Sequence, residues 1–92
     1  SVMEIFKLQI GDIVESTQGR DLGCRYVVIN IDKKGYCSLM NGKLRTIDKP
    51  KLKNPLHLSY VGSYPELIER LKGPITNHEL NKLIEKFNAM EE

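Results

Sequence analysis

The stretch 16-STQGRDLGCRYVVINI-31 joins a loop bounded by two glycines to a run rich in valine and isoleucine. Gly19 and Gly23 bracket an Arg-Asp pair, and such a glycine pair marks a loop whose backbone bends sharply and lets another molecule approach closely. In the run over 25–32, side chains alternate between two faces as a strand packed on a core requires. The residues expected to share one face of this strand are Val27, Ile29 and Ile31.

Turn signals on both sides of this run predict further short strands. Upstream, Ile10-Gly11-Asp12 opens the segment IVEST, and downstream 32-DKKG-35 has the charged start and closing glycine of a tight reversal. Asn41-Gly42 predicts a hairpin, because both residues tolerate the positive φ of a type I′ turn. We therefore expect the segments 36–40 and 43–48 to pair as strands across this turn.

The next segments complete a set of five short antiparallel strands. Pro50 and Pro55 forbid a regular helix over 49–55 and suit an extended edge segment. The segment LHLSYV, over 56–61, is expected to form the fifth strand. Five short strands with a long first loop predict a mainly β fold, a small five-stranded barrel of the SH3-like type.

The periodicity becomes helical after this set of strands. Two capping boxes, Ser63-x-x-Glu66 and Thr76-x-x-Glu79, predict two short C-terminal helices, which Gly73-Pro74 separates. Each helix carries one apolar stripe, and we expect the stripes to pack on each other or on the barrel. The alternative is that they remain open for a protein partner. The stripe residues are Leu67, Ile68 and Leu71 in the first helix and Leu80, Leu83, Ile84 and Phe87 in the second.

The distribution of charge divides the chain at the same boundary. Residues 1–62, the expected barrel, carry ten Lys/Arg against six Asp/Glu. Residues 63–92, the expected helical hairpin packed on the barrel in a single compact domain, carry four against six. The densest basic run is 43-KLRTIDKPKLK-53, so a partner with negative charge is expected to contact the first part of the chain.

Composition is that of one small soluble domain. The chain has 92 residues, of which 40% are hydrophobic and 28% charged, with a net charge of +2. No apolar run is long enough to span a bilayer, and the first ten residues lack the pattern of a signal peptide. We therefore expect a cytoplasmic protein with no membrane partner.

No pattern of residues indicates catalysis or metal binding. Cys24 and Cys37 are thirteen positions apart, and neither His57 nor His78 completes a standard set of metal ligands. Buried thiols are the favoured interpretation of the cysteines, and a metal site is the alternative. No nucleophile is placed beside a base, and the phosphate-loop and dinucleotide signatures are absent. We expect no enzymatic activity, no small-molecule substrate and no cofactor.

The basic run predicts a surface for a polyphosphate backbone. In an extended chain, residues two apart share a face at about 6.5–7 Å, so Lys49, Lys51 and Lys53 would form a row of ammonium groups. Lys43 and Arg45 would continue this row, and the first loop would add two more cations if the fold brings it near. Those two cations are Arg20 and Arg25. The alternative is that all seven are solubilising surface charges.

Three motifs together resemble a known family. Gly11-Asp12-Ile13-Val14, the loop 19-GRDLG-23 and the alternating strand over 26–31 resemble the KOW motif, a short barrel element shared by ribosomal proteins and transcription factors. The continuation resembles more narrowly the large-subunit ribosomal proteins of the fourteen-e type and small bacterial KOW-domain RNA-binding proteins. The segments that carry this narrower resemblance are 42-GKLR-45, 49-KPK-51 and His57-Leu58, and the whole resemblance covers residues 8–60.

The resemblance implies an SH3-like (KOW) barrel that binds ribosomal RNA, most simply that of the large subunit, in the ribosome or during its assembly and translation. Gly19 and Gly23 would let the first loop approach a ribose-phosphate surface, and Arg20 would bind a phosphate or a guanine edge. Asp21 can only accept hydrogen bonds when ionised, so we expect it to hold the loop in shape. Ribosomal proteins are further possible partners, and a protein-interaction module of the transcription–translation machinery is the alternative function.

Overall fold

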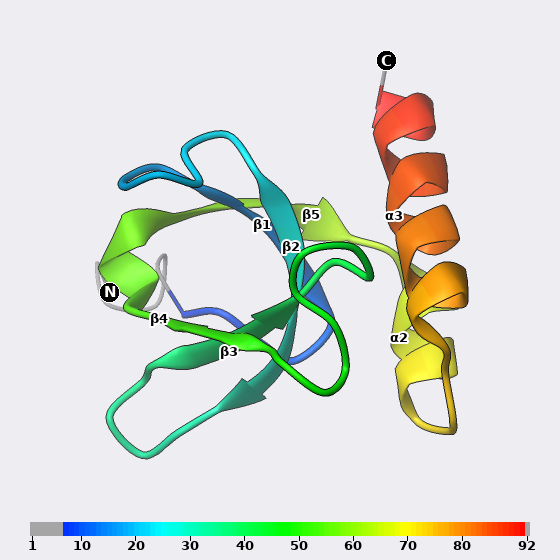
Figure 1. Cartoon of the computed structure of the whole chain (residues 1–92), viewed down its shortest axis with the longest axis horizontal. Helices are drawn as coiled ribbons and strands as arrows, with labels where there is room; N and C mark the ends of the chain where they lie inside the picture. Colours follow the sequence, from blue (N-terminus) through cyan, green and yellow to red (C-terminus); the bar gives the residue numbers. More distant parts are fainter. Residues whose placement is uncertain (1–6, 92) are drawn as a thin grey trace.

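The computed structural model describes residues 7–91; residues 1–6 and 92 of the expected domain ranges lie outside the described residues. Five strands are followed by two C-terminal helices (Figure 1). The strands are β1 (Asp12–Ser16), β2 (Arg25–Ile31), β3 (Cys37–Met40), β4 (Lys51–Lys53) and β5 (Leu58–Ser63). The helices are α2 (Pro65–Leu71) and α3 (Asn77–Glu91), and a short 3-10 helix, η1 (Pro55–His57), precedes β5.

The five strands form one antiparallel sheet in the order β4-β3-β2-β1-β5. This is the expected small five-stranded sheet followed by two helices. The sheet is strongly curled, and η1 links its two edge strands, β4 and β5, at one end (Figure 1). These edge strands do not pair in the described part of the chain, so the sheet is not closed into a barrel.

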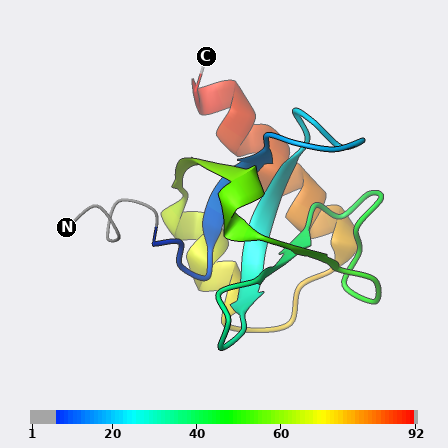
Figure 2. The same ribbon diagram turned by 90° about the vertical axis from the view of Figure 1, so that its left-hand side faces the viewer.

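Each face of the sheet carries an apolar cluster. The concave face holds an apolar cluster around Val14, Val28 and Leu39, each with no exposed surface. The convex face is covered by α2 and α3, which Figure 2 shows behind the sheet. Leu67 and Leu80 of these helices are fully buried in one cluster with residues of β1, β2 and β3. The apolar stripes of both helices therefore pack against the sheet.

An irregularity in the sheet changes which side chains of β2 share a face. Val27 and Ile29 both pack in the cluster under the helices, as their alternation predicts. Ile31 instead packs in the concave cluster with Val28, so the prediction that it shares the face of Val27 is wrong. The pairing of β2 with β3 shifts register between Val28 and Asn30, and a bulge of this kind reverses which way the following side chains point.

The reversal over 32–35 forms as its sequence predicts. Gly35 has a φ of 91°, which glycine adopts without strain. The Asp32 carboxylate accepts hydrogen bonds from the backbone nitrogens of Lys34 and Tyr36 at 2.9 and 3.0 Å. The side chain of Asp32 thus satisfies the backbone of its own turn.

The predicted hairpin at Asn41-Gly42 is wrong in its turn and in its fourth strand. Only glycines have positive φ in the described part of the chain, so Asn41 does not take part in a type I′ turn. Residues 41–50, which we call the second loop, separate β3 from β4, and 43–48 is not a strand. Asn41 Oδ1 accepts from the backbone nitrogens of Lys43 and Arg45 at 3.0 and 3.1 Å, which curls the chain on itself.

The second loop folds back onto α3. A Cβ atom placed on Gly42 would lie 2.3 Å from the backbone oxygen of Asn77, so the two backbones are in close contact. The side chain of Asn77 also accepts a hydrogen bond from the backbone nitrogen of Ile47 at 2.9 Å. Contact with a helix thirty residues away therefore competes with the local preference for a two-residue hairpin.

The two capping boxes have different outcomes. Thr76 and Glu79 form the predicted box, with reciprocal side-chain to backbone hydrogen bonds of 3.1 and 3.2 Å. The box predicted at Ser63 is wrong, because α2 begins after Tyr64 and has no side-chain cap. Ser63 is the last residue of β5, and its hydroxyl donates to Asp12 at 3.2 Å.

Candidate nucleic-acid interface

The first loop, residues 17–24, is closed tightly by backbone hydrogen bonds. Ser16 and the end of the loop exchange two of them, from Gly23 N to Ser16 O and from Ser16 N to Cys24 O, both 2.9 Å long. Gly19 and Gly23 have φ values of 91° and 88°, so both predicted loop-shaping glycines occupy the left-handed region. The loop therefore has one defined conformation at the end of β1.

Asp21 fixes this loop to the sheet through four side chains. Its carboxylate accepts hydrogen bonds from Ser16 Oγ at 2.8 Å, Tyr26 Oη at 2.8 Å and Lys53 Nζ at 2.7 Å. Lys51 Nζ lies 3.2 Å from its second oxygen. The sequence predicts that Asp21 holds the loop, but it places none of these partners. We call Asp21 with these four side chains the Asp21 cluster.

The cluster stabilises the ionised carboxylate. Burial alone would raise the pKa of Asp21, but the hydrogen bonds from Lys53, Ser16 and the other two donors outweigh it and hold this pKa well below its usual range. Burial, and then the hydrogen bond to Asp21, raise the pKa of Tyr26 above its ordinary value. Tyr26 is 3% exposed, so its ring packs in the core and is not available to stack on a base.

The three lysines of the predicted row do not form an exposed row. Lys51 and Lys53 do share a face of β4, as period two requires, but that face is directed at Asp21. Lys53 is 8% exposed, and its ammonium also donates to the backbone oxygen of Gln18 at 2.8 Å. Lys49 lies in the second loop before β4 and is exposed. Lys53 is thus part of the scaffold, and Lys51 is shared between scaffold and surface.

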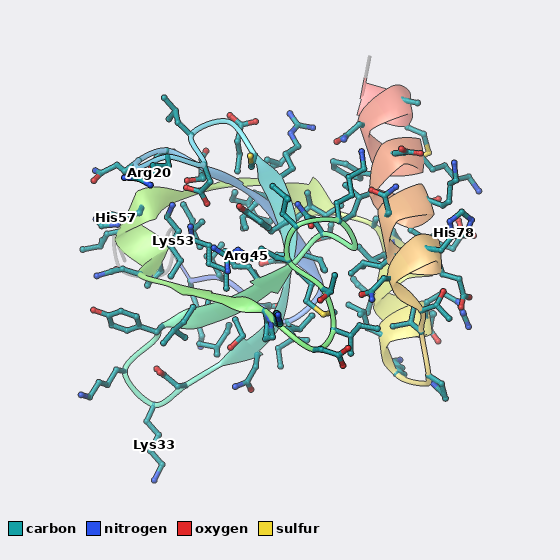
Figure 3. The ribbon with its side chains drawn as sticks, in the orientation of Figure 1. Arg20, Lys33, Arg45, Lys53, His57 and His78 are labelled. Carbon is teal, nitrogen blue, oxygen red and sulfur yellow. The ribbon has the colours of Figure 1, made fainter. Side chains whose placement is uncertain are left out.

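A cleft between the two loops gathers three of the predicted cations. Arg20 from the first loop, Arg45 from the second and Lys51 from β4 line a cavity of about 440 Å³ together with Asp21. In the view of Figure 3 Arg45 is drawn over the hollow side of the sheet, and Arg20 is drawn on the loop above it. We call this cavity the loop cleft. Leu44, at its rim, is 84% exposed.

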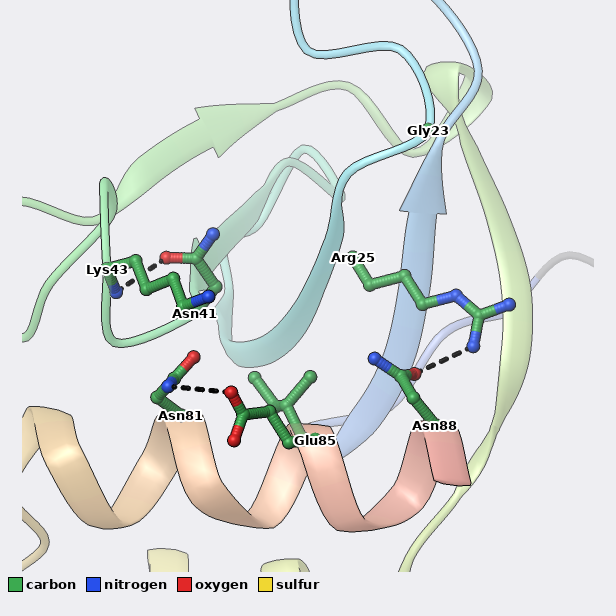
Figure 4. Close-up of a pocket in the computed structure, with 8 residues that line it drawn as sticks. Gly23, Arg25, Asn41, Lys43, Asn81, Glu85 and Asn88 are labelled. Carbon is green, nitrogen blue, oxygen red and sulfur yellow. Dashed lines mark hydrogen bonds between the residues drawn. The ribbon is translucent and has the colours of Figure 1, made fainter. Parts of the chain in front are cut away.

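A second cleft lies between the loops and α3 (Figure 4). We call it the helix cleft; its volume is also about 440 Å³. Arg25 and Lys43, two further predicted cations, line it. Arg25 donates to Glu15 Oε1 at 3.1 Å and to Asn88 Oδ1 at 2.8 Å, so it connects β1 with α3. The other lining residues are Gly23, Asn41, Asn81, Ile84, Glu85 and Asn88.

Sequence reasoning missed the contribution of α3. Asn81, Glu85 and Asn88 are spaced by four and three residues and therefore share one face of the helix. That spacing is visible in the sequence, but it does not show that the face lies opposite Arg25 and Lys43. The predicted cations are therefore distributed between two adjoining clefts, with Lys49 and Lys53 outside both.

The structure also locates the two cysteines and bears on metal sites and membrane-spanning helices. Cys37 is buried and Cys24 is half-buried, and both thiols are free. In the described range 7–91, no three His, Cys, Asp or Glu side chains lie close enough together to hold a metal ion. No helix in the same range has the length and apolar character needed to cross a membrane.

Comparison with known proteins adds no relative. No protein-family model matches the chain, and neither does any curated protein. The assignment of a function therefore depends on the residues and their geometry.

Proposed function

We propose that this protein is a non-catalytic RNA-binding module of the KOW type, with an SH3-like scaffold, that acts in the cytoplasm. Its proposed target is ribosomal RNA, that of the large subunit first, in the ribosome or during its assembly and translation. The observation that best supports this function is the convergence of five predicted cations on two adjoining clefts. These cations are Arg20, Arg45 and Lys51 at the loop cleft and Arg25 and Lys43 at the helix cleft.

The arrangement suits phosphate contact because the cations lie on different segments and face shared hollows. Arg20 and Lys43 are exposed and would bind phosphates with little prior loss of ion pairs. Gly19 and Gly23 carry no side chain, so the backbone of the first loop can approach a ribose closely. The Asp21 cluster holds the loop in one conformation before binding, which lowers the entropic cost of association.

A protein partner from the transcription–translation machinery is the second candidate. Among the large apolar side chains of α2 and α3 in the described part of the chain, only Met90 is exposed, so the helix stripes offer little docking surface. The observation that favours a protein is instead the exposure of Leu22 and Leu44, at 67% and 84%, on the two loops. A partner would therefore contact the loop tips. The stripe residues that the helical alternative requires are Leu67, Leu71, Leu80 and Phe87.

Charge-neutralising variants test the proposal. The triple variant R20Q/K43Q/R45Q removes three cations from the two clefts, and we expect its affinity for large-subunit ribosomal RNA at 100 mM salt to fall at least about tenfold. The control K33Q/K34Q/K72Q removes three exposed cations elsewhere; Figure 3 shows Lys33 far from Arg20 and Arg45. Equal losses in the two variants would contradict a site at the clefts. If the variant L22S/L44S keeps full RNA affinity, the two exposed leucines are not part of the RNA site and would belong to the surface for a protein partner.

A further inference from the structure

We infer that the helix cleft receives one unpaired nucleotide of the bound RNA and selects bases that carry an exocyclic amino group. This inference rests on the proposed RNA binding and names the part of the RNA that the helix cleft reads. A cavity of about 440 Å³ lies in the range of small-ligand sites. Single-stranded RNA is read by proteins at bases that leave the stack and expose their edges.

The hydrogen-bonding groups of the helix cleft have fixed roles. Asn41 Oδ1 already accepts from two backbone nitrogens, which leaves its Nδ2 as a donor. Asn88 Oδ1 accepts from Arg25 Nη1 at 2.8 Å, and Figure 4 shows its amide nitrogen on the side that faces away from Arg25. These two amides are therefore oriented before any ligand enters.

Glu85 supplies the acceptor that distinguishes one base from another. Its carboxylate lies 3.4 Å from Asn81 Nδ2 and 3.4 Å from Lys82 Nζ, both long contacts, and its side chain is 50% exposed. A carboxylate in this cleft repels phosphate, but it can accept a hydrogen bond from a base. The exocyclic amino groups of adenine, cytosine and guanine can donate in this way, whereas uracil carries carbonyl oxygens in their place and offers only its ring N3–H between them. The carboxylate thus favours bases that present an amino group over uracil.

The charged groups around the helix cleft have two roles, recognition of the RNA backbone and recognition of the base. Arg25 and Lys43 enter it from β2 and the second loop, opposite α3 (Figure 4). They would bind the phosphates that flank the inserted nucleotide. The polar face of α3 would then meet the edge of the base, while Ile84, which is 5% exposed and packs in the core, contributes only a small apolar area to the lining.

The walls of the helix cleft are joined by contacts at three points. Gly42 fits against the backbone of Asn77 and Asn81 with no room for a Cβ atom. The hydrogen bond from Ile47 to Asn77 anchors the same loop at a second point, and the bond from Arg25 to Asn88 ties β2 to the far end of the helix. A site with this degree of preorganisation can discriminate between bases as well as bind them.

The experiment measures the affinity of the full chain for labelled single-stranded (rA)8, (rC)8 and (rU)8 at one low salt concentration, by fluorescence anisotropy. We expect (rA)8 and (rC)8 to bind about tenfold more tightly than (rU)8. In E85Q, the amide can donate to uracil as well as accept, so we expect this preference to fall below about threefold. The control E69Q removes the same charge from an exposed position on α2 and should keep the preference.

Each other outcome has a defined meaning. Equal binding of the three oligonucleotides by the wild-type protein, or an unchanged preference in E85Q, would overturn the inference while leaving RNA binding at the clefts intact. Absence of binding to all three oligonucleotides would overturn the inference, and absence of binding to large-subunit ribosomal RNA as well would overturn the proposed function with it. Circular dichroism and urea unfolding of each variant show whether the fold survives, so a loss of preference is not mistaken for unfolding.

Discussion

Lys53 Nζ lies 2.7 Å from the Oδ1 oxygen of Asp21, and the two side chains, one on β4 and one on the first loop, are 8% and 13% exposed. This pair joins the proposed RNA-binding loop to an edge strand of the sheet. A charge pair removed from water in this way is costly to break, because the remaining partner keeps its charge in a buried position.

Replacement of Lys53 by methionine should destabilise the protein strongly. We expect K53M to lower the free energy of unfolding by about 3 kcal/mol, since Asp21 loses its closest cation. Urea unfolding followed by circular dichroism measures the change. K49M, which alters an exposed lysine of the second loop, is the control and should change stability by less than about 0.5 kcal/mol. If the two variants were equally stable, the Lys53–Asp21 pair would not contribute to the fold.

The ionisation of Asp21 should appear in the acid stability of the protein. Because its folded pKa lies below the ordinary value of 3.8, the carboxylate contributes stability above that pH and loses it as the pH falls toward the folded pKa. We therefore expect the wild-type protein to lose stability between about pH 5 and pH 2 more steeply than D21N, which has no group to titrate there. Parallel curves for the two proteins would contradict a strongly stabilised carboxylate.

Asp21 should also support RNA binding although its charge is negative. Removal of an anion from an RNA-binding surface ordinarily strengthens binding. We expect D21N to weaken binding to ribosomal RNA severalfold at constant salt, because the first loop loses its anchor. The matched variant D48N removes an exposed anion from the second loop and should bind as tightly as the wild-type protein or more tightly. A gain of affinity in D21N would show that the loop does not need this anchor.

A comparison of Gly42 with Gly23 separates the effect of close backbone packing from the effect of backbone strain. Both have positive φ, 80° and 88°, so alanine is strained at either position by about 1 kcal/mol. Only at Gly42 would the added Cβ atom meet backbone, 2.3 Å from Asn77 O, whereas nothing lies within 4 Å at Gly23. We expect G42A to lower the melting temperature clearly more than G23A. Equal effects would mean that the second loop is not packed on α3.

The sequence predicts well what depends on neighbouring residues. The reversal at 32–35 and the capping box at Thr76 form because their donors and acceptors lie within four residues of one another. The two helices follow from periodicity, and the strand count agrees with the expected five although the fourth strand is Lys51–Lys53 and not 43–48.

What the sequence does not predict depends on distant contacts. The second loop packs on Asn77 and does not form a two-residue hairpin, because the helix satisfies groups that local turn chemistry cannot anticipate. Alternation places Lys51 and Lys53 on one face of β4, but only the curl of the sheet turns that face toward Asp21. The polar face of α3 likewise acquires a role only where it meets the second loop.

We expect the cations of the two clefts to bind ribosomal RNA through its phosphates. The most direct test is the affinity of the wild-type protein and of R20Q/K43Q/R45Q for large-subunit ribosomal RNA between 50 and 300 mM salt. Plotted as log affinity against log salt, the slope of the triple variant should be shallower than that of the wild-type protein by about 2, which corresponds to three lost phosphate contacts on single-stranded RNA. Identical slopes for the two proteins, or no binding at 50 mM salt, would contradict this expectation.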